Sequence, residues 1–148
     1  MASIVTRYTV KLVKEESHRY EVGTHLNSPY DVVDFLTKVV KIHENAEEVL
    51  ILIALDTKNK TIGWFEVARG SINSAVVNPR EVFKRAILCN SASIMIAHNH
   101  PSGNVTPSQE DIAITKRMFE CGKILDIKLL DHLIIGESYT SLKEEGII

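Results

Sequence analysis

Residues 91–111 read SASIMIAHNHPSGNVTPSQED and contain an apolar run, a turn signal and the start of a helix. The run SASIMIA is short and apolar, as is typical of a strand inside a sheet. Residues 101–104 (Pro-Ser-Gly-Asn) favour a reversal of the chain. A helix that begins near Pro107 would then return over the strand. We therefore expect a strand-turn-helix unit at the centre of the fold.

This unit carries two histidines and an acid that could bind a metal. Side chains alternate along a strand, so His98 and His100 point the same way and can hold one ion. Asp111 falls in the early turns of the following helix. Two imidazoles and one carboxylate form a usual protein ligand set of a catalytic zinc, with water as the fourth ligand. Each histidine alone would suit a loop, but the combination predicts one Zn²⁺ per chain, zinc being preferred over iron or manganese for this set.

A hydrolytic zinc site also needs a group that moves protons. Glu48, at the entrance to the apolar run 49–56, is the best-placed candidate, and Glu47 competes with it. From position alone, a solvated turn is the simpler interpretation of both. Ser108 lies three residues before Asp111 and shares its helix face. Its hydroxyl could stabilise an oxyanion, or it could be an ordinary polar residue of a first helical turn.

Asp131 and His132 are neighbours in a predicted strand, so only one of them can face the metal side. That one could orient a metal ligand from behind. A buried polar residue with satisfied hydrogen bonds is an equally good interpretation of either.

The helices are predicted from capping patterns and from the spacing of apolar residues. A polar cap followed by proline occurs three times, and in the second and third copies Glu81 and Gln109 can complete a capping box. Gly122 is expected to cap the end of the third helix. The predicted helices, with the residue and proline that open them, are 28–43 (Ser28-Pro29), 79–88 (Asn78-Pro79) and 107–121 (Thr106-Pro107).

Strands are predicted from β-branched and apolar runs bounded by turns, at 49–56, 61–70, 91–97, 127–135 and 139–142. Residues 4–13 and 18–23 should form an N-terminal hairpin. The result is an α/β fold with a single mixed β-sheet flanked by about three helices. We divide the chain into residues 1–44, a hairpin and helix packed on the core, and residues 45–148, the metal-binding domain, in one globular unit.

Composition limits the function classes. The chain has 148 residues, a net charge of −2 and no dense Lys/Arg block, which argues against DNA binding without excluding a local basic patch. It has no signal-peptide pattern and no apolar run of about 20 residues, so we expect a cytoplasmic protein with no membrane partner. Exposed strand edges could pair two copies into a homodimer.

The stretch HNHPSGNVTPSQED resembles the signature of the JAMM (JAB/MPN) metalloproteases, in which His-x-His is followed by ten residues and an aspartate. The resemblance is closer still to the RadC-like branch of that family. It covers roughly residues 45–148. The segments that carry it are LDTKNKTIG, GSINSAVVNPREVFKRAI, AHNHPSG, PSQEDIAITKRM, LLDHLIIG and SLKEEGII.

The resemblance implies a site and an activity. It makes His98, His100 and Asp111 the zinc ligands, maps the catalytic glutamate to Glu48 and maps the oxyanion-stabilising serine to Ser108. It implies the sheet-and-helix layering that JAB domains share with cytidine deaminases. It also implies a metallopeptidase that cleaves peptide or isopeptide bonds, with a peptide or isopeptide-linked protein as substrate.

One departure from the family bears on the alternatives. RadC proteins usually carry a helix-hairpin-helix region before the JAB domain, and residues 1–44 lack one. We therefore expect a stand-alone form, in which a DNA-repair role is weakened. Two alternatives to the hydrolase stay open: a non-catalytic, metal-containing binding module, and a DNA-repair or DNA-processing factor.

Overall fold

The computed structural model describes residues 4–20, 23–73 and 77–148. It contains one five-stranded sheet with the strand order β2-β1-β3-β4-β5. The strands are β1 (Val49–Leu55), β2 (Thr61–Arg69), β3 (Ser93–Asn99), β4 (Lys128–Ile135) and β5 (Tyr139–Ser141). β3 and β4 pair in parallel, and the other neighbours pair antiparallel. The predicted mixed sheet is confirmed.

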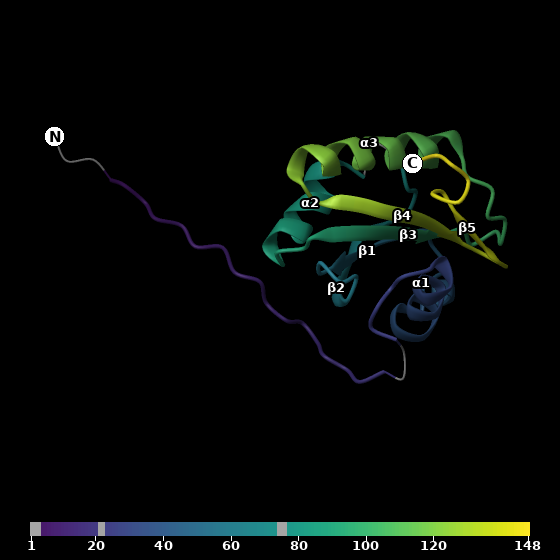
Figure 1. The fold of residues 1–148 in the computed structure, drawn as a ribbon, viewed down its shortest axis with the longest axis horizontal. Helices are drawn as coiled ribbons and strands as arrows, with labels where there is room; N and C mark the ends of the chain where they lie inside the picture. The colour runs from purple at the N-terminus through teal and green to yellow at the C-terminus, as the bar shows by residue number, and fades with distance from the viewer. Residues whose placement is uncertain (1–3, 21–22, 74–76) are drawn as a thin grey trace.

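Helices cover both faces of this sheet, as predicted. Two of them, α2 (Pro79–Leu88) and α3 (Gln109–Leu125), lie on one face, and α1 (Pro29–Phe35) lies on the other (Figure 1). After α1 the chain continues through a π-helical turn and a 3₁₀ turn, Leu36–Val40 and Ile42–Glu44. In the described part of the chain, no helix combines the length and the apolar character needed to cross a membrane.

β1 holds the two halves of the core together. Its seven residues are all buried, and it lies between β2 and β3. Leu50 and Leu52 pack with α2 and α3, whereas Ile51 and Ile53 pack with α1. A strand covered on both faces is apolar at every position, which explains the run VLILIAL.

The sheet register decides where the histidines point. Leu50 pairs with His98 in the antiparallel ladder between β1 and β3. Residues directly opposite each other in such a ladder share a face, so His98 lies on the side of α2 and α3. The parallel strands β3 and β4 require a crossover connection, and α3 provides it. The first turn of α3, with Asp111, therefore lies near the end of β3.

The predicted end of the third helix was wrong. α3 continues to Leu125, and Asp126 caps it in the left-handed conformation with φ of 57°. Gly122 lies inside the helix, where its carbonyl accepts a hydrogen bond from Ile127 N at 2.9 Å. A Cβ at Gly122 would come within 2.5 Å of Ile127 O. The glycine is therefore needed for the close return of the chain rather than for a positive φ.

The capping patterns were partly correct. Asn78 caps α2 as predicted, but the Glu81 carboxylate contacts Lys84 and Arg85. The third helix starts at Ser108, not at Thr106. Complete capping boxes occur where serine is followed three residues later by aspartate, at Ser28/Asp31 and Ser108/Asp111.

The described residues of the N-terminal segment do not form the predicted hairpin. Residues 4–20 contain no strand and are exposed, and Figure 1 shows them leaving the body of the molecule as an extended segment. Glu21 and Val22, within the predicted 18–23 strand, lie outside the described residues. An isolated two-stranded hairpin is marginal in water, and here residues 4–13 have no apolar surface to pack on. The predicted helix does pack on the core, and the division at residue 44 stays a prediction.

Gly122→Ala should destabilise the fold by about 1–3 kcal/mol, because the added methyl overlaps a backbone carbonyl that cannot move without its strand. Chemical denaturation of the purified variant measures this change. Gly63→Ala is the matched control, since a Cβ at Gly63 meets nothing within 4 Å. Equal stabilities of the two variants would contradict the close-approach explanation.

Candidate metal centre

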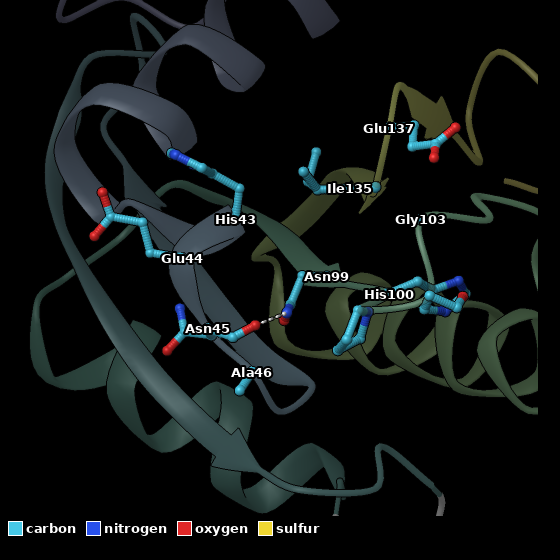
Figure 2. Close-up of a pocket in the computed structure, with 12 residues that line it drawn as sticks. His43, Glu44, Asn45, Ala46, Asn99, His100, Gly103, Ile135 and Glu137 are labelled. Atoms are coloured by element: carbon cyan, nitrogen blue, oxygen red, sulfur yellow. Dashed lines mark hydrogen bonds between the residues drawn. The ribbon is translucent and has the colours of Figure 1, made fainter.

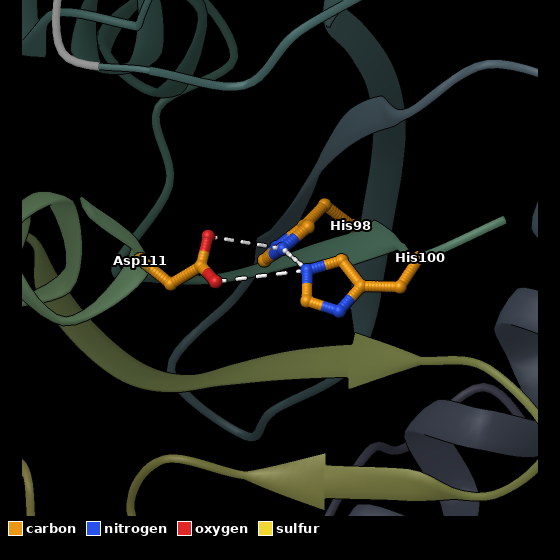
Figure 3. A group of neighbouring side chains, drawn as sticks. All are labelled: His98, His100 and Asp111. Atoms are coloured by element: carbon orange, nitrogen blue, oxygen red, sulfur yellow. Dashed lines mark hydrogen bonds and ion pairs between the residues drawn. The ribbon is translucent and has the colours of Figure 1, made fainter. Parts of the chain in front are cut away.

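The structure brings His98, His100 and Asp111 together, as the sequence predicted. Their ligand atoms all lie within 4.8 Å of one another (Figure 3). His98 Nε2 is 2.9 Å from His100 Nε2 and 3.1 Å from Asp111 Oδ1, and His100 Nε2 is 3.6 Å from Asp111 Oδ2. His98 and Asp111 are buried, and His100 is partly exposed. The three groups thus form one cluster that is open on the side of His100.

The hydrogen-bond partner of His100 fixes which of its nitrogens is free. His100 Nδ1 lies 2.7 Å from the carbonyl oxygen of Asn104. A carbonyl can only accept, so Nδ1 carries the hydrogen. In the neutral ring, the lone pair is then on Nε2, which faces the cluster.

A longer hydrogen-bond chain does the same for His98. The Thr115 hydroxyl donates its one proton to the Asp111 carbonyl at 2.6 Å, so it accepts from His132 Nδ1, also at 2.6 Å. His132 Nε2 then accepts from His98 Nδ1 at 2.8 Å. Burial away from water, with a contribution from His98, holds the pKa of the His132 imidazole well below its ordinary value, which keeps it neutral. The lone pair of neutral His98 is therefore also on Nε2.

These two sets of hydrogen bonds leave three hydrogen-bond acceptors facing one another. They are His98 Nε2, His100 Nε2 and the Asp111 carboxylate. Two imidazole lone pairs and a carboxylate repel at such distances unless a positive charge lies among them. A divalent cation supplies that charge, and nitrogen and carboxylate oxygen are common ligands of zinc and related metals. The donor set therefore fits a metal ion.

Asp111 is oriented by the helix start. Ser108 Oγ and Ser108 N both donate to Asp111 Oδ2 at 2.7 Å, and Asp111 N donates to Ser108 Oγ at 3.1 Å. Burial alone would raise the pKa of the Asp111 carboxyl. When His98 is protonated, hydrogen bonding and charge attraction from its imidazolium, together with the Ser108 hydrogen bonds, outweigh burial and lower the pKa of Asp111. Asp111 is thus held ionised with Oδ1 directed toward His98.

Ser108 has a visible role at the helix start. Its single hydroxyl proton goes to Asp111, so the hydroxyl would have to turn before it could donate to a substrate oxyanion. The role of Ser108 in oxyanion stabilisation stays a prediction.

The structure distinguishes Glu48 from Glu47. Glu48 immediately precedes β1, two residues from Leu50, which pairs with His98 at the end of the β1–β3 ladder. The Glu48 carboxylate is partly buried and accepts from Ile72 N at 3.0 Å. The Glu47 side chain is 60% exposed. Of the two, Glu48 is the more buried, and its role as base stays a prediction.

Asp131 and His132 also differ in their hydrogen-bond partners. The Asp131 carboxylate accepts from Ser141 Oγ at 2.6 Å, His132 N at 2.7 Å and Lys143 N at 3.1 Å, and so joins β4 to the last turn. Of the two, His132 is the residue whose side chain hydrogen-bonds to a histidine of the cluster, His98. Sequence reasoning missed Thr115, although its position four residues after Asp111 places both on one helix face.

A groove of about 580 Å³ opens beside His100 (Figure 2). Its walls are formed by residues 43–46, 99–103 and 135–137. The described lining residues include two carboxylates, Glu44 and Glu137, and no lysine or arginine. Of the three cluster residues, only His100 lines this groove, and its described lining is acidic.

Comparison with known proteins gives consistent results. Residues 26–147 match the RadC-like JAB domain family. The chain is 52% identical over 124 residues to a UPF0758 protein of Clostridium beijerinckii, covering 83% of this chain and 53% of that protein. It is 55% identical over 124 residues to one of Clostridium novyi, covering 83% of this chain and 54% of that protein. For one of Methanosarcina barkeri, the identity is 48% over 122 residues, with 82% and 52% covered.

The chain spans about half the length of these curated relatives. The family match includes α1 and every strand of the sheet, and it begins at residue 26, earlier than the resemblance noted in the sequence. It also contains His98, His100 and Asp111. The chain belongs to the RadC-like JAB domain family.

Proposed function

We propose that this chain is a zinc-dependent hydrolase of the JAMM type that cleaves peptide or isopeptide bonds. The observation that carries the proposal is the convergence of His98 Nε2, His100 Nε2 and an Asp111 carboxylate oxygen within 4.8 Å. Hydrogen bonds from behind keep both histidine lone pairs directed into the cluster. A site whose histidine lone pairs are already oriented suits a metal ion that keeps one coordination position open toward the groove.

The chemistry would be shared between the ion and the protein. A zinc ion held by the three ligands would supply an acidified water and polarise the substrate carbonyl. Glu48 would accept a proton from the attacking water and deliver it to the leaving amine, so that it ends the cycle as it began. Ser108 would donate to the oxyanion once its hydroxyl turns away from Asp111.

The acidic groove argues against the DNA-processing alternative. A phosphate backbone is bound through lysine and arginine, and the described lining residues offer Glu44 and Glu137 instead. A scaffold without catalysis is the other alternative. The partly buried, hydrogen-bonded carboxylate of Glu48, two residues from the partner of His98, supports the hydrolase, because hydrolysis needs a proton acceptor.

Purified protein should contain or take up one zinc ion per chain, and the His98→Ala/His100→Ala variant should bind none. Removing two of three ligands leaves one carboxylate, which cannot hold zinc alone. Elemental analysis with equilibrium dialysis measures the stoichiometry. Glu47→Gln is the control, since its side chain is exposed away from the site. A folded wild-type chain that takes up no zinc would overturn the proposal.

Glu48→Gln should keep zinc and lose hydrolysis by about 10²–10⁴-fold, because an amide cannot accept the proton. A panel of peptide and isopeptide-linked substrates, assayed with wild-type protein first, provides the measurement. Glu47→Gln should retain wild-type rates. Undiminished turnover in Glu48→Gln would remove Glu48 as the base, and a zinc-loaded wild type inactive on the whole panel would favour the scaffold.

Thr115→Val should weaken zinc binding by about tenfold, because the chain that orients His98 loses its acceptor. Thr115→Ser keeps the hydroxyl and should bind zinc nearly as the wild type does. Competition with a chromophoric chelator gives both affinities. Equal affinity in the valine and serine variants would show that the hydroxyl does not orient the ligand.

A further inference from the structure

Asn99 lies between the two histidines of the cluster but points to the opposite face of the sheet. It is only 3% exposed, and its amide is fully used. Asn99 Oδ1 accepts from Val49 N at 2.7 Å, and Nδ2 donates to Glu47 O at 2.9 Å. Nδ2 also donates to Asn45 O at 3.3 Å (Figure 2). The side chain therefore binds the backbone that leads into β1.

These bonds begin where the sheet ladder stops. The pairing of β1 with β3 ends at Leu50 and His98. Beyond that point, the Asn99 amide replaces a neighbouring strand. The groups that it holds, Glu47 O and Val49 N, lie on either side of Glu48 along the chain.

Glu48 is held from its other side by the segment that follows β2. Its carbonyl accepts from Gly70 N at 2.9 Å, and its carboxylate accepts from Ile72 N at 3.0 Å. The backbone at Glu48 is therefore fixed between Asn99 and residues 70–72. Without Asn99, the bonds that hold this stretch in the described residues would come from β2 and residues 70–72, on its other side.

We propose that Asn99 is a positioning residue that fixes the Glu48 carboxylate relative to the metal centre. This inference rests on the proposed function, because it assigns Glu48 the role of base. Asn99 acts through the backbone around Glu48 and contacts no atom of the ligand cluster. Its loss should disturb the base and leave metal binding nearly intact.

The chemistry of the position requires asparagine. The backbone there presents one N–H and two carbonyls, so the side chain must accept and donate at once. Aspartate cannot donate to the two carbonyls, and leucine, although similar in shape, can do neither. Serine is too short to span Val49 and Asn45 together.

The test uses Co²⁺ as the probe, in the full chain, and follows the pH midpoint of its visible absorption. A nearby carboxylate raises the pKa of an ionising group, so Glu48→Gln should lower the midpoint by about half a unit. Asn99→Leu and Asn99→Ser should lower it in the same direction, with Co²⁺ affinity within about twofold of wild type. Adding either change to Glu48→Gln should produce no further shift.

Gly122→Ala is the control for destabilisation alone, because it should weaken the fold without moving the midpoint. Using both Asn99 variants guards against one that does not fold. If Glu48→Gln shifts the midpoint and neither Asn99 variant does, this inference fails while the base assignment stands. An additive shift in the double variants would also overturn it. If Glu48→Gln causes no shift, the base assignment and this inference both fail.

On an active substrate, Asn99→Ser should lower kcat by about 10–100-fold with little change in KM, the pattern expected of a misplaced catalytic group. A raised KM with unchanged kcat would instead assign Asn99 to substrate binding and contradict the proposal.

Discussion

The centre of this protein depends on a hydrogen-bond chain that starts at the Asp111 backbone carbonyl. The chain passes through Thr115 and His132 to His98, whose Nε2 lies 3.1 Å from the Asp111 carboxylate. These residues come from α3, β4 and β3. Because each donor or acceptor role along this chain is fixed by the next residue, the chain orients His98 and joins three elements of the fold. Substitution of Thr115, His132 or His98 by an apolar residue would leave its neighbour without a hydrogen-bond partner.

This hydrogen-bond chain can form only because of the sheet topology. β3 and β4 are parallel, so α3 must cross over between them and start near the end of β3. β1 pairs antiparallel with β3, so the start of β1, with Glu48 just before it, lies toward the end of β3. Groups from positions 98 to 132 therefore meet at one end of the sheet. The acidic groove beside His100 opens at that same end.

The sequence predicted those features that depend on residues close to one another in the chain. The alternation of His98 and His100 and the capped helix that carries Asp111 were enough to predict the cluster. The rest needed the three-dimensional structure: Asp131 and His132 were distinguished by their hydrogen-bond partners, and Glu48 differed from Glu47 in burial. Strand propensity over residues 4–13 was misleading, because propensity largely reflects packing against neighbours that this segment lacks. Gly122 showed its role only once the return of Ile127 was known.

The exposed N-terminal segment and the outer edge of β2 affect colloidal behaviour. β2 is an edge strand, and in the described residues the His25–Lys60 bridge covers only its start. An open edge together with a β-prone segment is a route to aggregation. Charged residues interrupt both surfaces, with Arg7 and Lys11 in the segment and Glu66 and Arg69 on β2. Charges of this kind oppose stacking of chains, so these residues help to keep the protein dispersed at high concentration.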